Sequence, residues 1–233
     1  MKPLRFTLVL LASAIIAPAA LAQDAPPPTN QEIFAPLDFP APTDTRAGSG
    51  RRGPGYWQQR ADYRIEVTLD TASHGVTGVE GIAYTNNSPD SLEALWLHLP
   101  QNLFAPNSRG ALVNPSSRWR GAFAGGGMQI KSVELRRNDE RITPDYTITD
   151  TRMRIPLERP LPGGGGRIVV TVQWSFIVPE YGADRMGRFR SEDGWVYEIA
   201  QWYPRMAVYD DVNGWNPMPY LGQGEFYLEY GNF

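Results

Sequence analysis

The sequence predicts an all-β fold, most simply a sandwich of mostly antiparallel strands. Several runs alternate apolar and polar residues at every second position, which is the period of a half-buried strand. Turn-forming residues separate these runs, and after residue 22 no long segment carries the apolar period of a helix. A chain of 233 residues, 42% of them hydrophobic, is long enough to bury a core of its own.

Residues 1–22 have the pattern of a secretory signal peptide. Lys2 and Arg5 precede an apolar run, and the stretch "ALA" that ends at Ala22 is a small-x-small pattern of the kind that signal peptidase cuts. A membrane anchor is the alternative, but the run is shorter than the roughly 20 residues that a bilayer requires, and Pro18 interrupts it. We therefore expect an exported protein, periplasmic or secreted, from a Gram-negative bacterium, with no membrane span after cleavage.

Residues 23–61 form the next segment, which is rich in proline, glycine and serine, as in "DAPPPTN" and "RAGSGRRGPG". This composition predicts a flexible leader that lies against the surface. Ordered structure is expected to begin at "DYRIEVTLD", so that residues 62–233 form the β-sandwich.

The first three strands follow from the alternation of their residues. In "DYRIEVTLD" one face is apolar and the other polar, and the apolar face consists of Tyr63, Ile65, Val67 and Leu69. A second strand is predicted in "GVTGVEGIAYTNN". The third, "LEALWLHL", places leucines on the face opposite Trp96 and His98.

The next strand, "MQIKSVELR", contains a phase change of one residue. Met128 and Ile130 follow one phase and Val133 and Leu135 the other, which predicts a β-bulge. Shorter strands are expected near Thr147 and at "RMRIPL". The glycines of "PGGGG" then predict a turn into "RIVVTVQWSF", which has an apolar face made of Ile168, Val170, Val172, Trp174 and Phe176.

Charge argues against a nucleic-acid partner, and the absence of cysteine excludes several cysteine-dependent features. Loss of Lys2 and Arg5 with the signal leaves 20 of the 22 Lys+Arg against 25 Asp+Glu, a net charge of −5. Because no basic stripe exists to replace phosphate counterions, we expect no nucleic-acid partner. The chain has no cysteine, which rules out disulfides, a lipoprotein cysteine and a thiolate metal site.

Several common catalytic and metal-binding motifs do not occur in the sequence. His74 and His98 lack H-E-x-x-H or H-x-H spacing, so no catalytic or metal-ligating residue is assigned, and His98 is expected to be structural or on the surface. Neither a G-x-S-x-G elbow nor a P-loop is present. In "YDDVNGWNPMPY" tyrosines occupy the first and twelfth positions of a calcium loop, so a tight turn at Asn213 and Gly214 is the simpler interpretation, with a weak calcium site as the alternative.

Two further hypotheses concern carbohydrates. Glu198 with Asp210 or Asp211 could serve as the acid and base of a glycosidase. Three tryptophans could stack on sugar rings, although they could equally fill a core or an interface: Trp195, Trp202 and Trp215. A carbohydrate- or solute-binding β-sandwich is therefore the alternative function.

Stretches from residue 63 to 233 resemble the amino-terminal domain of bacterial aminopeptidase N-like zinc metallopeptidases, the gluzincins. The most specific parts are "TNNSPDSLEALWLHL" and "QWYPRMAVYDD". The resemblance implies a saddle-shaped β-sandwich that lies against a thermolysin-like catalytic domain. That domain supplies H-E-x-x-H, a further glutamate ligand and a tyrosine that stabilises the tetrahedral intermediate, and none of this apparatus occurs here.

The same resemblance implies a role for single residues. The chain would be the non-catalytic domain, truncated before the catalytic one and inactive alone, with no cofactor of its own and with zinc and the peptide substrate bound through the missing domain. Gln201 matches the position that reaches into the pocket for the substrate's amino group. The catalytic domain would cover an aromatic surface made of Trp202, Tyr203, Tyr209 and Trp215.

Overall fold

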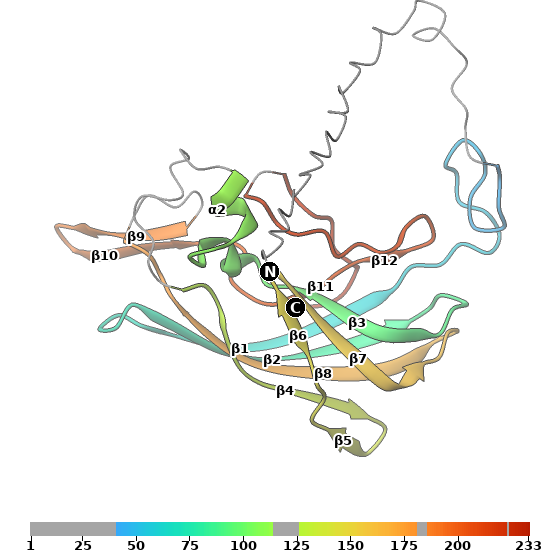
Figure 1. Ribbon diagram of the computed structural model, residues 1–233, viewed down its shortest axis with the longest axis horizontal. Helices are drawn as coiled ribbons and strands as arrows, with labels where there is room; N and C mark the ends of the chain where they lie inside the picture. Colours follow the sequence, from blue (N-terminus) through green and yellow to red (C-terminus); the bar gives the residue numbers. More distant parts are fainter. Residues whose placement is uncertain (1–40, 114–125, 181–185, 223) are drawn as a thin grey trace, which may run out of the picture. The chain divides into compact units, whose positions relative to one another are not determined.

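The computed structural model describes residues 41–113, 126–180, 186–222 and 224–233, and within them the fold is all-β (Figure 1). The predicted signal peptide and residues 23–40 of the predicted leader lie outside this part of the chain. In the described residues the helices are the short 3-10 helix η1 (Pro100–Phe104) and the single-turn helix α2 (Arg109–Val113). The predicted fold class is confirmed. No helix in the described ranges is long and apolar enough to cross a membrane.

The strands form two main antiparallel sheets and two small hairpins. The larger sheet has the order β1-β2-β8-β4-β5 and the smaller one β11-β3-β7-β6, while β9 pairs with β10 and β12 with β13. The strand bounds in chain order are β1 (Arg60–Asp70), β2 (Gly75–Asn86), β3 (Leu92–His98), β4 (Gln129–Arg137), β5 (Glu140–Ile142), β6 (Thr147–Thr149), β7 (Arg152–Leu161), β8 (Gly166–Ile177), β9 (Met186–Ser191), β10 (Gly194–Ile199), β11 (Arg205–Met206), β12 (Tyr209–Asp210) and β13 (Gly214–Trp215).

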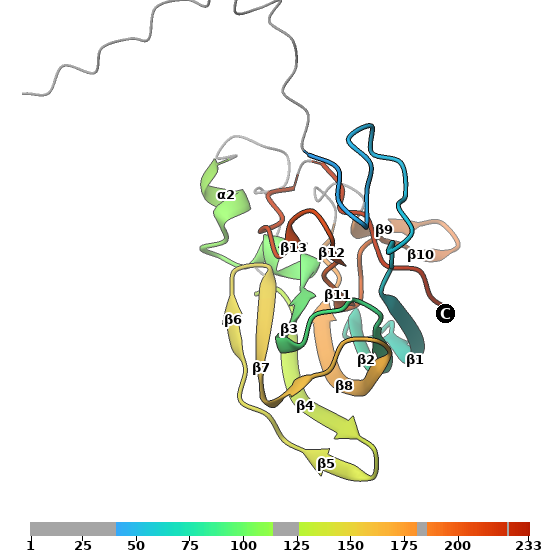
Figure 2. The same cartoon turned by 90° about the vertical axis from the view of Figure 1, so that its right-hand side faces the viewer.

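One cluster of buried side chains joins the two sheets. Tyr63, Ile82 and Val170 lie in register on β1, β2 and β8, so their side chains share one face of the larger sheet. Leu97 on β3 and Ile155 on β7 are fully buried in the same cluster. Figure 2 shows β3, β7 and β6 beside the strands of the larger sheet. Burial of these apolar faces is the main driving force for the fold.

Two local predictions are confirmed by the strand pairing. The register of β4 against β8 shifts between Ile130 and Ser132, where the phase change predicts a bulge. The glycine-rich turn joins β7 to β8, and Gly164 and Gly165 have φ of 67° and 103°. These left-handed conformations are the reason that the turn needs glycine.

The second half of β1 differs from its predicted environment. Tyr63 is buried as predicted, but Val67 is 49% exposed and Leu69 39% exposed, although they belong to the apolar face. Alternation indicates which side chains share a face, but it does not indicate how far along the strand that face is covered.

Residues 43–59 of the predicted leader make defined contacts with the sandwich, and we call them the strap. Arg46 donates two hydrogen bonds to the Asp211 carboxylate, with its Nε 2.6 Å from Oδ2 and its Nη2 2.8 Å from Oδ1. The ring of Trp57 stacks on that of Tyr209, with centroids 5.7 Å apart. The strap therefore joins a segment before β1 to the last part of the described chain.

Candidate functional site

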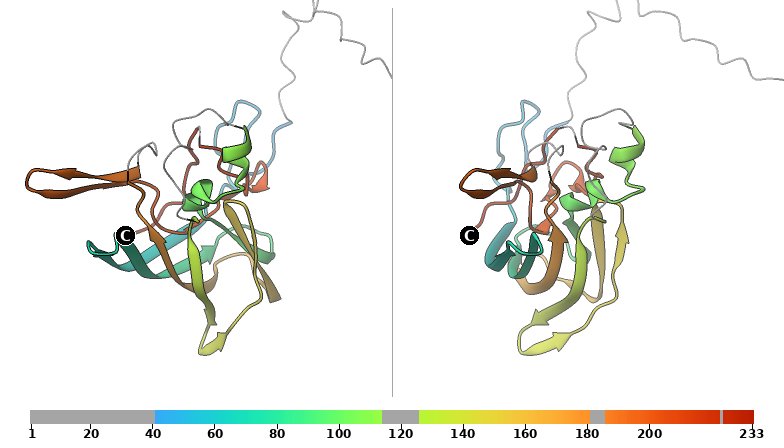
Figure 3. Two further views of the ribbon diagram at one scale, coloured as in Figure 1. Left: turned by 60° about the vertical axis from the view of Figure 1, so that its left-hand side comes forward. Right: turned by 90° about the vertical axis from the view of Figure 1, so that its left-hand side faces the viewer.

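The region around Gln201 is the candidate site, and we call residues 201–216 the corner. The chain enters the corner from β10, part of the β9–β10 hairpin that projects from the sheets (Figure 3). It then joins the smaller sheet, where Arg205 pairs with His98 and Met206 with Leu97 across β11 and β3. Residues 204–208 are buried, so the corner is anchored at its centre.

Gln201 itself sits in an unusual backbone conformation. Its φ is 51°, in the left-handed region that few non-glycine residues adopt. Nε2 of Gln101, a buried residue in η1, donates to the carbonyl oxygens of Ala200 and Gln201 at 3.0 and 3.1 Å. This pair of hydrogen bonds holds the backbone of residues 200 and 201. The half-buried side chain of Gln201 makes no hydrogen bond with the described residues.

Gln101 was not predicted as part of a site. It lies in "LPQNLF", about a hundred positions before Gln201, where no motif distinguishes it from any other glutamine. Its role depends on the fold bringing η1 under residues 200 and 201, which sequence periodicity does not encode.

Aromatic and charged side chains of the corner pack together with Tyr63 of β1. The Tyr63 hydroxyl accepts a hydrogen bond from the amide of Met206 at 2.9 Å, and burial raises the pKa of Tyr63 well above its usual value. The ring of Tyr203 meets that of Tyr63 edge-on at 5.7 Å. Arg205 is only 8% exposed, and its burial lowers the pKa of the guanidinium. These contacts fix the backbone that follows Gln201.

Glu80 on β2 is a carboxyl group inside the core. Its side chain shares a face with Val76 and Ile82, is fully buried, and has no hydrogen-bond partner for either carboxylate oxygen in the described residues. Burial raises the pKa of Glu80 well above its usual value, so the neutral acid is favoured. A charged residue in the apolar phase of "GVEGIAY" is the sequence signal that could have revealed it.

His98 is expected to be either structural or on the surface, and its burial agrees with the structural role. It is 2% exposed, and its ring stacks on that of Phe226 with centroids 4.6 Å apart. Burial lowers the pKa of His98 to about 4, helped by the nearby charge of Arg205. The imidazole is therefore neutral near pH 7.

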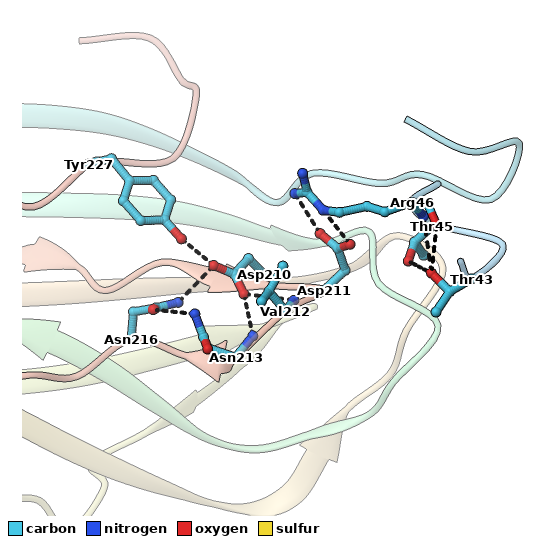
Figure 4. A network of polar contacts seen from close by, with 9 residues as sticks. All are labelled: Thr43, Thr45, Arg46, Asp210, Asp211, Val212, Asn213, Asn216 and Tyr227. Atoms are coloured by element: carbon cyan, nitrogen blue, oxygen red, sulfur yellow. Dashed lines mark hydrogen bonds and ion pairs between the residues drawn. The ribbon is translucent and has the colours of Figure 1, made fainter. Parts of the chain in front are cut away.

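Asp210 and Asp211 are both used to build the corner (Figure 4). Oδ1 of Asp210 accepts from the amides of Val212 and Asn213 at 2.9 and 2.7 Å, which closes the predicted tight turn between β12 and β13. Burial opposes the charge on Asp210, but these amides and the hydroxyl of Tyr227 hold its pKa below the usual value. The hydrogen bonds from Arg46 do the same for the pKa of Asp211.

These contacts bear on the glycosidase and calcium hypotheses. Glu198 is exposed on β10, while Asp210 and Asp211 accept hydrogen bonds from Asn216 and Arg46, so both aspartates hold the corner together. No group of three or more His, Asp or Glu in the described ranges could hold a metal ion.

The three tryptophans of the sugar-binding hypothesis belong to different ring clusters. Trp195 meets His74, Trp202 meets Trp174, and Trp215 meets Tyr84, with centroids 4.5, 5.9 and 6.1 Å apart. All three tryptophans are half-buried. These three tryptophans thus do not form one flat row of exposed rings of the kind that stacks on a glycan.

The aromatic surface predicted to await a catalytic domain is likewise packed within the chain. The four rings are half-buried and lie against the hydrophobic core: Trp202, Tyr203, Tyr209 and Trp215. Between residues 201 and 220 the exposed apolar side chains are instead Val212 and Met218, which are 66% and 64% exposed.

The described residues thus form an all-β domain with two main antiparallel sheets and two small hairpins. No protein-family model and no curated protein matches the sequence. Solved structures similar to the chain include an M1 zinc metallopeptidase from Deinococcus radiodurans, at 12% identity and a TM-score of 0.34, over 53% of this chain and 21% of that one.

Two-domain M1 zinc metallopeptidase mutants are also similar. The one bound to L-tryptophan has 10% identity over 55% of this chain and 22% of its own, with a TM-score of 0.34. The one bound to L-arginine has 12% identity over 57% of this chain and 28% of its own, with a TM-score of 0.34. The chain thus spans between about a fifth and somewhat over a quarter of these structures, and a likeness at this level decides neither family nor activity.

Proposed function

We propose that residues 62–233 form the non-catalytic first domain of an exported zinc metallo-aminopeptidase. In this role the sandwich packs on a catalytic domain and contributes Gln201 to the pocket for the substrate's amino group. The sequence resemblance in "TNNSPDSLEALWLHL" and "QWYPRMAVYDD" supports the proposal. The observation that carries it is the state of Gln201, whose backbone is held by Gln101 while its side chain has no partner in the described residues.

The chemistry of an amide suits this role. The side-chain oxygen of Gln201 accepts a hydrogen bond from an ammonium group without adding a charge to the pocket. A fixed backbone lowers the entropy that the side chain loses on binding. Zinc would be held by the catalytic domain, and Gln201 would contact the amino group and not the metal.

The test uses the protein as its native gene produces it, purified and assayed for zinc content and aminopeptidase activity. Gln201→Asn shortens the side chain by one methylene and keeps a residue that tolerates a left-handed backbone. A lost hydrogen bond to a charged group is worth about 1.5 to 3 kcal/mol, so kcat/KM should fall about tenfold or more. Gln201→Glu should retain binding, because a carboxylate also accepts from an ammonium.

The matched control is Gln173→Ala, which truncates an exposed glutamine on β8. It should leave kcat/KM unchanged, and zinc content should be the same in every variant. A native gene product with neither zinc nor aminopeptidase activity would contradict the proposal. If Gln201→Asn leaves the aminopeptidase activity unchanged, the peptidase assignment stands but the proposed role of Gln201 is wrong.

A further inference from the structure

The turn between β12 and β13 contains the one Asn-Gly pair of the sequence, Asn213 and Gly214. Asparagine is a thermolabile residue, because its side-chain amide is lost when the backbone nitrogen of the next residue attacks the side-chain carbonyl carbon. Glycine in that next position favours the attack, since it has no Cβ atom to shield its nitrogen. The other asparagines of the chain are all followed by larger residues.

The side chain of Asn213 is accessible and weakly held. Asn213 is exposed, and its Nδ2 lies 3.5 Å from Oδ1 of Asn216, which is long for a hydrogen bond. Its backbone amide, in contrast, donates to Oδ1 of Asp210 at 2.7 Å (Figure 4). The turn is therefore held through its backbone, while the side chain of Asn213 can still change rotamer.

The hairpin that carries this turn is small. β12 and β13 pair over two residues each, with Gly214 in register with Asp210. The nitrogen of Gly214 has to leave this pairing before it reaches the side chain of Asn213. Short pairings at exposed turns open at a small free-energy cost, so the reactive geometry is reached without unfolding the sandwich.

We propose that Asn213 is a site of spontaneous deamidation, which replaces its amide with a carboxylate and loosens the corner. The nitrogen of Gly214 forms a bond to Cγ of Asn213, the bond from Cγ to Nδ2 breaks, and the proton of the attacking nitrogen leaves with ammonia. Water then opens the succinimide ring at either of its carbonyl carbons. The products are an aspartate with the original backbone and an isoaspartate whose backbone is longer by a carbon atom.

The surroundings of position 213 disfavour a carboxylate. Nδ2 of Asn216 donates to Oδ2 of Asp210 at 3.1 Å, which turns Oδ1 of Asn216 towards Asn213. A carboxylate at position 213 would face this oxygen, and the neighbouring charges of Asp210 and Asp211 are of the same sign. Because Asp211 also binds Arg46, a turn displaced by this repulsion would loosen the strap as well.

The test incubates the purified chain near neutral pH for several weeks, digests it under mildly acidic conditions and follows the asparagines by mass spectrometry. The peptide that contains Asn213 should gain the mass difference between a carboxyl group and an amide. Asn138 is the internal control, because it is exposed in the turn between β4 and β5 but is followed by Asp139. Asn213 should react at least about tenfold faster than Asn138.

A synthetic peptide of residues 209–217 measures the same reaction without the fold. The folded chain should react at a rate within about a hundredfold of the peptide, because the hairpin opens readily. Asn213→Gln should keep its mass during the incubation, since the longer side chain would have to close a larger and less favourable ring.

The effect on the corner is tested with Asn213→Asp, which places one product in the turn from the start. Limited proteolysis should cut the strap at least about twofold faster than in the wild type, because the turn that holds Asp211 is displaced. The matched control is Asn138→Asp, which adds the same charge to the turn between β4 and β5 and should be cut at the wild-type rate.

Three results would overturn the proposal. The first is an Asn213 that keeps its amide throughout the incubation. The second is loss of the amide at equal rates from Asn213 and Asn138, since the glycine would then give no advantage. The third is a strap that is cut at the wild-type rate in Asn213→Asp, because the new carboxylate would then leave the corner intact.

Discussion

At the scale of single residues, the sandwich contains two ionisable side chains whose charge states are set by burial. Glu80 and His98 are both almost inaccessible to solvent, and neither has an ion-pair partner among the described residues. Burial disfavours the charged form of each, which raises the pKa of Glu80 and lowers that of His98. The two residues therefore make stability depend on pH in opposite directions.

Glu80→Gln should stabilise the folded protein at pH 7. Because the pKa of Glu80 is raised on folding, the folded protein keeps this proton at a pH where the unfolded chain has lost it. The contribution of Glu80 to the free energy of unfolding is therefore largest below pH 4.5 and falls as pH rises towards the folded pKa. Within that window each pH unit costs about 1.4 kcal/mol. Glutamine has no proton to lose, so urea unfolding of the variant should show a smaller loss of stability from pH 5 to pH 8. Glu93→Gln, an exposed position on β3, should behave as the wild type.

His98 should contribute to unfolding in acid. Its folded pKa of about 4 lies below the ordinary value of 6.5, so the stability it contributes is present above pH 6.5 and is lost as pH falls towards 4. Linkage gives a loss of about 2 kcal/mol between pH 7 and pH 5 from this group alone. His98→Asn should therefore unfold with a shallower dependence on pH in that interval. A variant with the same pH dependence as the wild type would show that His98 is not buried as a neutral ring.

At the scale of elements, the central strands of the larger sheet depend on one close contact between glycine and tryptophan. A Cβ atom on Gly78 of β2 would lie 2.3 Å from the ring of Trp174, the fully buried residue paired with it on β8. Gly81, three positions further along β2, has no atom within 4 Å of its Cβ position. The same strand thus contains a glycine that is required and one that is not.

Gly78→Ala should destabilise the fold because Trp174 must move within a packed core, at a cost of about 1 to 3 kcal/mol. Gly81→Ala should be neutral or stabilising by up to about 1 kcal/mol, because it reduces the freedom of the unfolded chain. Chemical unfolding followed by tryptophan fluorescence measures both. Equal effects of the two substitutions would contradict the packing of Trp174 over Gly78.

At the scale of the whole molecule, the strap and the C-terminal segment tie distant parts of the sequence together. Arg46 binds Asp211 across 165 positions, and Asn232 donates to Asp62 across 170. The side chain of Asp211 is only 6% exposed, so its charge depends on the guanidinium of Arg46. Contacts over such separations close long loops, which costs conformational entropy.

Arg46→Ala should loosen the strap and cost about 1 kcal/mol or more of stability, because it leaves Asp211 with fewer partners in a nearly buried position. Arg46→Lys should restore little of this, since an ammonium cannot reproduce two parallel hydrogen bonds. Limited proteolysis should cut residues 43–59 faster in both variants. Arg51→Ala, at an exposed position of the strap, is the control and should be cut at the wild-type rate.

The sequence is sufficient to predict the class of fold, because a period of two is a local property of each strand. It also located the bulge in β4 and the turns at residues 162–166 and 213–214, which depend on phase changes and on glycine. It singled out Gln201 by resemblance. The contact through which Gln101 holds the backbone at Gln201 becomes visible only in the folded chain, since these residues are a hundred positions apart.

Burial was also decided by the tertiary structure. Val67 and Leu69 belong to the apolar phase of β1 and yet lie exposed, while His98 belongs to the opposite phase of β3 and yet is covered by Phe226. Alternation assigns a side chain to a face, but burial depends on what the rest of the chain places over that face. For this protein that information lies in contacts between segments remote in sequence, such as residues 230–233 against β1, which no local pattern encodes.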